Sequence, residues 1–129
     1  MSDDMLTGFL ERKEYLVLAS TRSDGRPHAT MSAFTIFDGR FWCPTLPGTA
    51  RTRNIEREPR VSLVITEGEG DEHAVVLIEG DAVLVADGDQ PEGVTQRYKA
   101  KVGAAPEWAR LWIAVEATRV LSYAAEDWV

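Results

Sequence analysis

The hydrophobic pattern at the start of the chain predicts one helix followed by one strand. In residues 3–12 the apolar side chains fall on one stripe at helical spacing, and we expect Asp3 or Asp4 to cap this helix. Residues 15–21 are rich in β-forming side chains and apolar at consecutive positions, as in a strand that is buried on both faces. The chain is therefore expected to begin with an amphipathic helix and then to enter a sheet.

Two Asp-Gly pairs predict the next turns. Asp24-Gly25 and Asp38-Gly39 supply residues that tolerate the positive φ angles of a tight hairpin. They separate residues 15–21, 27–37 and 40–45, each of which has the composition of a strand. Two consecutive hairpins of this kind predict an antiparallel meander.

The rest of the chain mixes strands and short helices. Gly80 interrupts a long apolar run and predicts a bend or bulge there. The predicted elements are a helix over 49–58 that is capped by Thr49 and ended by Pro59, strands over 61–66 and 73–86 separated by an acidic loop over 67–72, a helix over 91–102, a turn over 103–107, and strands over 110–115 and 119–123.

These elements predict a mainly β fold. Roughly six or seven antiparallel strands with two or three short helices are expected to close into a small barrel, because closure removes exposed strand edges. No repeat, low-complexity tract or linker divides the sequence, so residues 1–129 are expected to form a single domain.

The charge and the cysteine content narrow the class of protein. The chain carries 14 Lys or Arg and 21 Asp or Glu, and its net charge of −7 disfavours non-specific binding to nucleic acid. Cys43 is the only cysteine, which suits a reducing compartment. The N-terminus has no signal-peptide features, and the longest aliphatic run, residues 74–78, is much shorter than the ~20 residues of a membrane span. We expect a soluble cytoplasmic protein with no nucleic-acid or membrane partner.

A basic segment from residue 49 to residue 60 carries the candidate chemistry. It contains four Arg and two Glu, a local charge of +2, and Arg51 and Arg53 lie in the first helical turn. The first N–H groups of a helix lack partners within it and the helix dipole is positive there, so an anion is favoured at this end. Arg53 and Arg57 are like charges one turn apart, which is unfavourable unless they share an anion. The segment predicts a phosphate site; the alternative is an exposed helix whose arginines pair with neighbouring acids.

Short motifs that match one protein family occur in order along nearly the whole chain. They are LVLAST (16–21), DGRP (24–27), DGRFW (38–42), RTRNI (51–55), PRV (59–61), IEGDA (78–82) and ATRVLSY (117–123). This ordered set resembles the pyridoxamine 5′-phosphate oxidase-like split-barrel family, which includes FMN-dependent and coenzyme F420-dependent oxidoreductases. The resemblance implies a split barrel of the FMN-binding type and a homodimer, with the cofactor in a groove between the subunits.

The resemblance also implies a set of cofactor-binding residues. Arg51 matches a position where many members have a phosphate-binding lysine, and an arginine there keeps the charge and adds a bidentate fork. Segments 29–32 and 42–45 match the strands that flank the flavin-type ring. The implied residues are Thr30, Ser32, Trp42, Pro44, Thr45, Arg51, Arg53, Asn54 and Arg57. Trp42 has a plainer interpretation as a core residue.

The activity that the resemblance implies is hydride transfer to or from a small organic substrate, with F420 or FMN as the cofactor. Members that are short, rich in Arg and Ala, and end in a Val-Leu-Ser-aromatic strand resemble the F420-using branch, and FMN is the close alternative. Arg57 and Arg60 would extend the basic track toward the carboxylates of the F420 tail. Two other functions remain open: a non-catalytic protein that binds or stores flavin, deazaflavin or haem, and an interaction domain with an empty groove.

Other common site chemistries have no motif in this sequence. HExxH, CxxC and GxGxxG are absent, and no Ser-His-Asp set stands out. His28 follows the first hairpin and would reach a phosphate near the groove, although a surface histidine on a strand is the simpler interpretation. Because a flavin-type cofactor performs the redox chemistry itself, no catalytic side chain is nominated.

Overall fold

The structure is a computed structural model that describes residues 2–68 and 73–124. In this part of the chain, seven antiparallel strands form one sheet in the order β2-β1-β5-β6-β7-β4-β3, with three short helices. The elements are α1 (Asp3–Arg12), β1 (Tyr15–Thr21), β2 (Pro27–Ala33), β3 (Thr35–Phe37), β4 (Arg40–Thr45), α2 (Ala50–Arg57), β5 (Arg60–Glu67), β6 (Ala74–Ala86), α3 (Glu92–Val102) and β7 (Leu111–Ala124). The predicted mainly β fold is confirmed.

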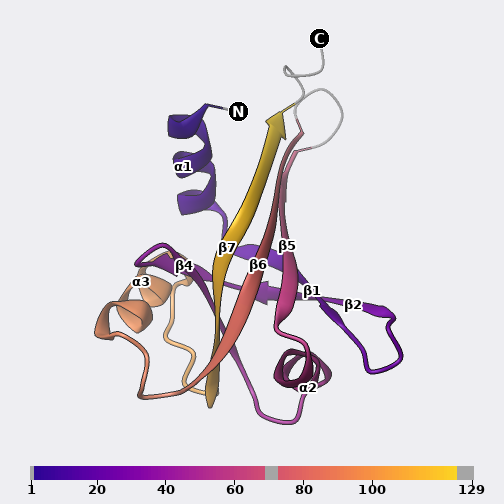
Figure 1. Cartoon of the computed structure of the whole chain (residues 1–129). Coiled ribbons are helices and arrows are strands. Elements are labelled where there is room, and N and C mark those ends of the chain that lie inside the picture. Colours follow the sequence, from indigo (N-terminus) through magenta and orange to yellow (C-terminus); the bar gives the residue numbers. More distant parts are fainter. Residues whose placement is uncertain (1, 69–72, 125–129) are drawn as a thin grey trace.

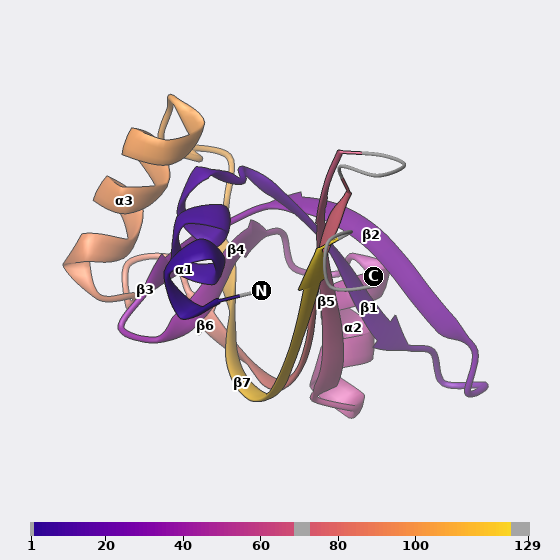
Figure 2. The same ribbon diagram turned by 90° about the horizontal axis from the view of Figure 1, so that it is seen from above.

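The sheet curls into a split barrel, with β2 at one edge and β3 and β4 at the other (Figures 1 and 2). The chain passes between these edges through Phe34, which is fully buried and whose N–H donates to the Glu14 carbonyl at 3.1 Å. The segment predicted as one strand over 27–37 is therefore two strands, because the chain leaves one edge of the sheet at Phe34 and joins the other.

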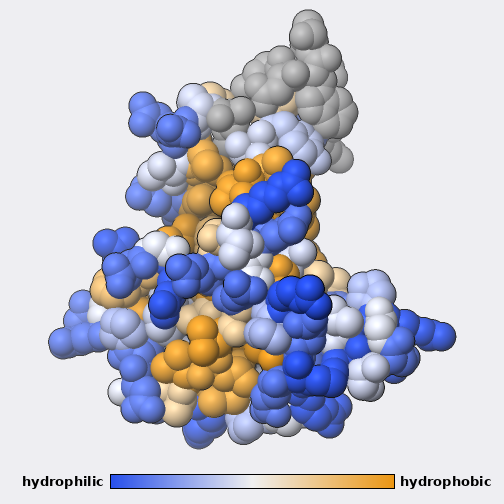
Figure 3. Space-filling model, in the orientation of Figure 1, coloured by the Kyte–Doolittle hydropathy of each residue, from blue (hydrophilic) through white to orange (hydrophobic). Residues whose placement is uncertain are grey.

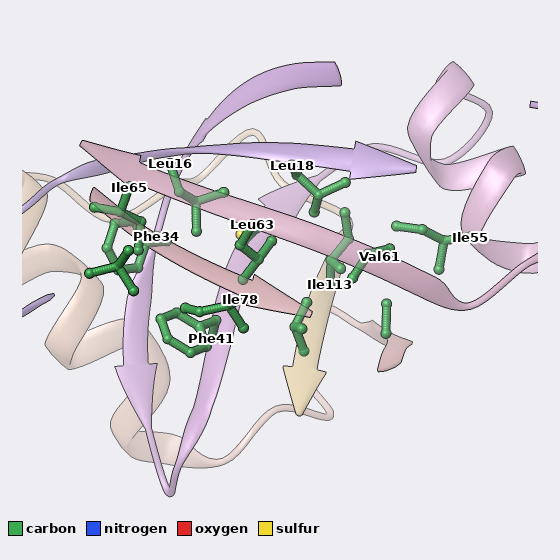
Figure 4. Close-up of a cluster of buried hydrophobic side chains, with 14 of the residues drawn as sticks. Leu16, Leu18, Phe34, Phe41, Ile55, Val61, Leu63, Ile65, Ile78 and Ile113 are labelled. Carbon is green, nitrogen blue, oxygen red and sulfur yellow. The ribbon is translucent and has the colours of Figure 1, made fainter. Parts of the chain in front are cut away.

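The main core fills the inside of the barrel (Figure 4). It combines alternate residues of β1, β5 and β6 with side chains from β4 and β7, and Ile55 of α2 closes one end. The fully buried members include Leu16, Leu18, Phe34, Leu63, Ile65, Ile78 and Ile113. Burial of each such aliphatic side chain contributes roughly 1.5–3 kcal/mol, so this cluster is the chief source of stability.

A second, smaller core lies between α3 and the outer face of β4 and β7. Trp42, Trp112 and Ala114 from the sheet pack against Val94 and Tyr98 of α3. The Tyr98 and Trp112 rings meet edge to face with centroids 5.7 Å apart, a favourable aromatic geometry. Helix α3 therefore adds a layer to the barrel on this side only.

The bend predicted at Gly80 is confirmed as a bulge. The register between β6 and β7 shifts after Glu79, so that Glu79 pairs with Arg119 and Gly80 with Ala117, leaving Thr118 as the extra residue. A Cβ atom on Gly80 would lie 2.5 Å from the Glu116 carbonyl oxygen, so only glycine fits. The predicted strands over 110–115 and 119–123 are one strand, because the bulge absorbs the irregular residue without ending the ladder.

Three further expectations are wrong. The predicted antiparallel meander does not form, because the two hairpins, β1–β2 and β3–β4, lie at opposite edges of the sheet. The first helix is capped by Ser2, which accepts a hydrogen bond from Met5 N–H at 3.3 Å, while Asp3 and Asp4 occupy its first turn. Strand β1 is buried on one face only, since Tyr15 is 51% and Val17 is 38% exposed on the outer face of the sheet. Apolar composition alone did not distinguish a strand inside a barrel wall from one buried on both sides.

The remaining boundaries follow the sequence closely. Thr49 caps α2 as expected and accepts from Thr52 N–H at 3.3 Å. Of the predicted acidic loop, Glu67 ends β5, and residues 69–72 lie outside the described residues. None of the helices among the described residues has the length and hydropathy of a membrane span.

Candidate functional site

The start of α2 is held against the end of β4 by hydroxyl groups. The loop between these elements turns at Gly48, whose φ angle of 78° suits glycine. Thr52 Oγ1 donates to the Leu46 carbonyl at 2.9 Å and lies 2.8 Å from Thr49 Oγ1. These contacts fix the orientation of the helix and of the arginines on it.

Arg51 points back along the chain toward β4. Its Nε donates to Thr45 Oγ1 at 3.0 Å and its Nη2 to the Pro44 carbonyl at 3.1 Å. Burial lowers the pKa of the half-buried guanidinium, and no carboxylate in the described part of the chain forms an ion pair with it. Arg51 and Thr45, both predicted site residues, are thus joined by a hydrogen bond.

Asn54 faces the opposite neighbour, β1. Its side chain is 5% exposed, and Nδ2 donates to the buried Ser20 Oγ at 3.1 Å. Because a buried amide without a partner is costly, this bond holds α2 against the first hairpin.

A basic pocket of about 550 Å³ lies between α2 and the β1–β2 hairpin. No Asp or Glu lines it, and its lining residues are Arg22, Ser23, His28, Ala50, Arg53, Asn54 and Arg57. Arg53 is exposed and its side chain has no hydrogen-bond or ion-pair partner among the described residues. Arg57 donates to the Thr21 carbonyl, and Arg22 lies 3.7 Å from Asp24. The pocket therefore presents three guanidinium groups and no carboxylate in its lining, an environment that favours an anion.

Strand β2 carries two buried polar atoms that have no partner. These are His28 Nδ1 and Thr30 Oγ1. The two residues pair across the ladder with Ser20 and Leu18, and strand alternation places them on the inner face of the sheet. Buried polar atoms are almost always satisfied in folded proteins, so a pair of exceptions beside a basic pocket points to a bound group or to water.

The other predicted residues of β2 and β4 are divided between two layers. Ser32 is 7% exposed on the inner face of β2, where its Oγ donates to the Ala33 carbonyl at 2.9 Å. Trp42 is 3% exposed in the second core and its Nε1 donates to the Phe37 carbonyl at 3.2 Å. Pro44, also buried, shares the face of Trp42, whereas Thr45 lies on the inner face. In the single chain, Trp42 is therefore a core residue, as the simpler of its two interpretations predicts.

The nine predicted residues do not form one cluster. Arg53, Asn54 and Arg57 line the basic pocket, whereas Arg51 leaves the helix on the side of β4. Arg60 does not extend this track, because its guanidinium pairs with Glu58 and lines a different surface hollow. The expectation of a basic track from Arg57 to Arg60 is therefore wrong.

Three residues of the β1–β2 hairpin line the pocket, and the sequence singled out only one of them, His28, as a residue within reach of a phosphate near the groove. Arg22, Ser23 and His28 belong to the β1–β2 hairpin, at the end nearest to α2. The signal was present in the sequence, since an Asp-Gly hairpin returns the residues on either side of it to the same end of the sheet. The sequence did not show where α2 lies relative to that hairpin.

Comparisons with known proteins bear on the family and the fold. The model of the pyridoxamine 5′-phosphate oxidase family matches residues 2–128. The chain belongs to the pyridoxamine 5′-phosphate oxidase family. The resemblance expected from the ordered motifs is thereby confirmed.

Solved structures of this family show the same fold. A conserved hypothetical protein of Mycobacterium tuberculosis is similar with a TM-score of 0.83 and 24% identity, over 99% of this chain and 88% of that one. The haem storage protein HutZ of Vibrio cholerae gives a TM-score of 0.73 at 16% identity, over 92% of each chain. A protein described as an F420 reductase gives 0.69 at 22% identity, over 88% of this chain and 94% of that one. At these identities the likeness establishes the fold, and the fold family holds both redox and haem-binding proteins.

A metal centre has no counterpart in the described residues. No group of three or more His, Cys, Asp or Glu side chains there is arranged to hold a metal ion. The basic pocket, the orphaned atoms of β2 and the Arg51–Thr45 contact are thus the features on which a function can be built.

Proposed function

We propose that this member of the pyridoxamine 5′-phosphate oxidase family is a cytoplasmic oxidoreductase that binds a phosphate-bearing deazaflavin or flavin, F420 or FMN. The observation that carries the proposal is the basic pocket beside α2, which no carboxylate lines and whose lining residue His28 has a buried ring nitrogen without a partner. A phosphate group offers the several acceptor oxygens that such a set of donors requires. The lone buried Cys43 is compatible with a reducing compartment.

The residues of the site have two roles in this proposal: some supply positive charge, and others hold the binding elements in place. Arg53, Arg57 and Arg22 supply charge for the phosphate, and Asn54 keeps α2 against the hairpin that carries Arg22. Arg51 supplies a further cation, which Thr45 and the Pro44 carbonyl hold at the end of β4.

The cofactor ring belongs, in this proposal, beside β2 and β4. Thr30 on the inner face of β2 offers its unpartnered hydroxyl group to the polar edge of the ring, and Ser32, whose proton goes to the Ala33 carbonyl, serves there as an acceptor. Thr45, Pro44 and Trp42 give rigidity to strand β4. The bound cofactor supplies hydride transfer, and the protein supplies binding, orientation and exclusion of water. Hydride transfer by the cofactor requires no side-chain acid or base.

The outer face of the sheet supports a homodimer with the groove at the subunit interface. One ladder row crosses five strands with an apolar residue in each: Met31, Val17, Val64, Leu77 and Leu121. Met31 is 70% and Leu121 is 41% exposed in the single chain. In Figure 3 apolar side chains gather around the upper part of β6 and β7. A contiguous apolar row of this length is typical of a protein interface rather than of a solvated surface.

Of the two cofactors, F420 is the one we propose first. The similarity to an F420 reductase supports this order, and so does the number of guanidinium groups around the pocket, since the F420 tail adds carboxylates to the phosphate. A second candidate function, storage of haem, is favoured by the similarity to HutZ, because haem also presents carboxylates to basic residues.

The experiment compares ligands that differ in the phosphate alone. FMN and riboflavin are titrated into the purified protein by fluorescence quenching, and F420 and haem are titrated in parallel. We expect FMN to bind at least about tenfold more tightly than riboflavin, since charge-assisted hydrogen bonds to the phosphate are worth 1.4 kcal/mol or more. In Arg53→Ala this advantage should largely disappear, whereas the matched control Arg40→Ala, at an exposed arginine of the β3–β4 hairpin, should keep it.

Three outcomes are informative beyond that comparison. Equal affinity for FMN and riboflavin, or an unchanged advantage in Arg53→Ala, would overturn the phosphate site. Tight binding of haem without binding of FMN or F420 would favour the storage function. If F420 or FMN binds, oxidation of the reduced cofactor by electrophilic acceptors such as quinones and enones distinguishes an enzyme from a carrier.

A further inference from the structure

A second cavity, of about 600 Å³, lies between α1 and α3, on the side of the barrel away from α2 (Figures 1 and 2). Leu10, Ile36 and Ala100 form apolar parts of its wall. Thr7 and Thr35 add hydroxyl groups. A cavity of this size accommodates a small organic molecule.

Two cations of α3 that line this cavity form no ion pair within the described part of the chain. Arg97 and Lys101 are one helical turn apart, a spacing at which like charges repel. Neither forms an ion pair with a carboxylate of the described residues; Arg97 lies over the Phe37 ring, 5.7 Å from its centroid. The third cation of the lining, Arg12, is already paired with Glu67 at 2.7 Å. Glu11 is the one carboxylate among the lining residues.

Lys101 is held inward by an unusual set of contacts. Its Nζ donates to the Leu10 carbonyl at 3.0 Å, and it lies over the Phe34 ring, 3.5 Å from the centroid. Burial lowers the pKa of this amine to about 8, although Glu11 and Glu14 on the α1 side and Cys43 act in the opposite direction. An ammonium group has three donors, and the carbonyl satisfies one of them. An anion in the cavity would accept a hydrogen bond from a second donor and replace the solvation that the ammonium group loses on burial.

We propose that the cavity between α1 and α3 binds a small monocarboxylate with an apolar tail, whose carboxylate contacts Lys101 and Arg97 and whose tail packs on Leu10, Ile36 and Ala100. The site lies apart from the basic pocket beside α2 and does not depend on the function proposed for that pocket. A monocarboxylate fits better than a phosphate or a polyanion, because one wall is apolar and the single carboxylate Glu11 already offsets part of the positive charge.

The test uses octanoate as the probe and its uncharged analogue octanamide as the comparison, with binding measured by isothermal titration calorimetry at pH 7. We expect octanoate to bind at least about tenfold more tightly than octanamide. Lys101→Met keeps the apolar stem and removes the charge, so it should weaken octanoate about tenfold and leave octanamide unchanged. Lys99→Met, at an exposed lysine of the same helix, is the matched control and should bind octanoate like the parent protein. Failure of octanoate to bind the parent protein, or equal binding by Lys101→Met, would overturn the proposal.

Amine labelling of the unaltered protein gives a readout that does not depend on the folding of a variant. The chain has three lysines, Lys13, Lys99 and Lys101, so reductive methylation followed by peptide mass spectrometry resolves each one. Octanoate should slow the methylation of Lys101 at least about threefold and leave the other two unchanged, because only Lys101 lines the cavity. Equal rates at Lys101 with and without octanoate would contradict the site.

Discussion

Asn54 of α2 and Ser20 of β1 are joined by a hydrogen bond of 3.1 Å, although 34 residues separate them in the sequence. Both side chains are buried, at 5% and 3% exposure. The bond places the basic face of α2 opposite the first hairpin, and the pocket that we assign to a phosphate lies between these two elements. Its strength can be measured without any ligand.

Asn54→Ala should destabilise the protein by about 1–3 kcal/mol, because it leaves the buried Ser20 hydroxyl without its partner. Ser20→Ala should have an effect of similar size, and the double variant should lose less than the sum of the two. Urea unfolding followed by circular dichroism measures all three. Strictly additive losses would mean that the two side chains do not interact in solution.

Replacement of glycine by alanine should have opposite effects on stability at Gly80 and at Gly8. Gly80→Ala should destabilise the protein by about 1–3 kcal/mol, because the added methyl group would meet the Glu116 carbonyl at 2.5 Å. Gly8→Ala is the control: it lies within α1, its nearest contact is 3.9 Å away, and alanine should stabilise that helix by up to about 1 kcal/mol. Thermal unfolding of both variants checks the signs, and a neutral Gly80→Ala would show that β7 can move aside.

Cys43 should be inert in the folded protein. It is fully buried, and burial raises the pKa of its thiol to about 11. Because the thiolate is the reactive form, iodoacetamide at pH 8 should modify the native protein at least about a hundredfold more slowly than the protein in urea. Intact mass spectrometry follows the reaction at this single cysteine. Fast labelling of the native protein would mean that β4 opens readily.

The lowered pKa of Lys101 predicts that the free energy of unfolding rises with pH. The pKa of its amine is about 8 in the folded chain and 10.5 as the ordinary value, so between these pH values the unfolded chain binds more protons. The free energy of unfolding should therefore increase as the pH rises from 7 to 9. In Lys101→Met that increase should be smaller, as measured by urea unfolding at each pH. Above pH 9 ionisation of Cys43 in the unfolded chain acts in the opposite direction, which sets the upper limit of the test.

The proposed dimer rests on the apolar row of the outer face. Met31→Asp places a charge at its most exposed member and should shift the protein toward monomers in sedimentation velocity, with weaker cofactor binding as a consequence. Met5→Asp, at an exposed position of α1, is the control and should sediment like the parent. A parent protein that sediments as a monomer would contradict the dimer directly.

The sequence by itself determined the local features of this fold. The Asp-Gly hairpins, the cap at Thr49, the end of α2 before Pro59 and the irregularity at Gly80 depend on backbone preferences of neighbouring residues, and each was predicted at the observed place. The ordered motifs indicated the family, and the family model that matches residues 2–128 confirms it.

The tertiary structure decided which of these elements meet. Whether the outer face of β1 is covered depends on what packs beside it, so its apolar run predicts a doubly buried strand, whereas the strand is buried on one face only. Arg51 and Arg53 differ by two positions, which on a helix directs them to different neighbours, β4 for one and the first hairpin for the other. His28 reaches the pocket, and Lys101 reaches the cavity against α1, only because strands and helices distant in sequence are brought together by burial of the two cores.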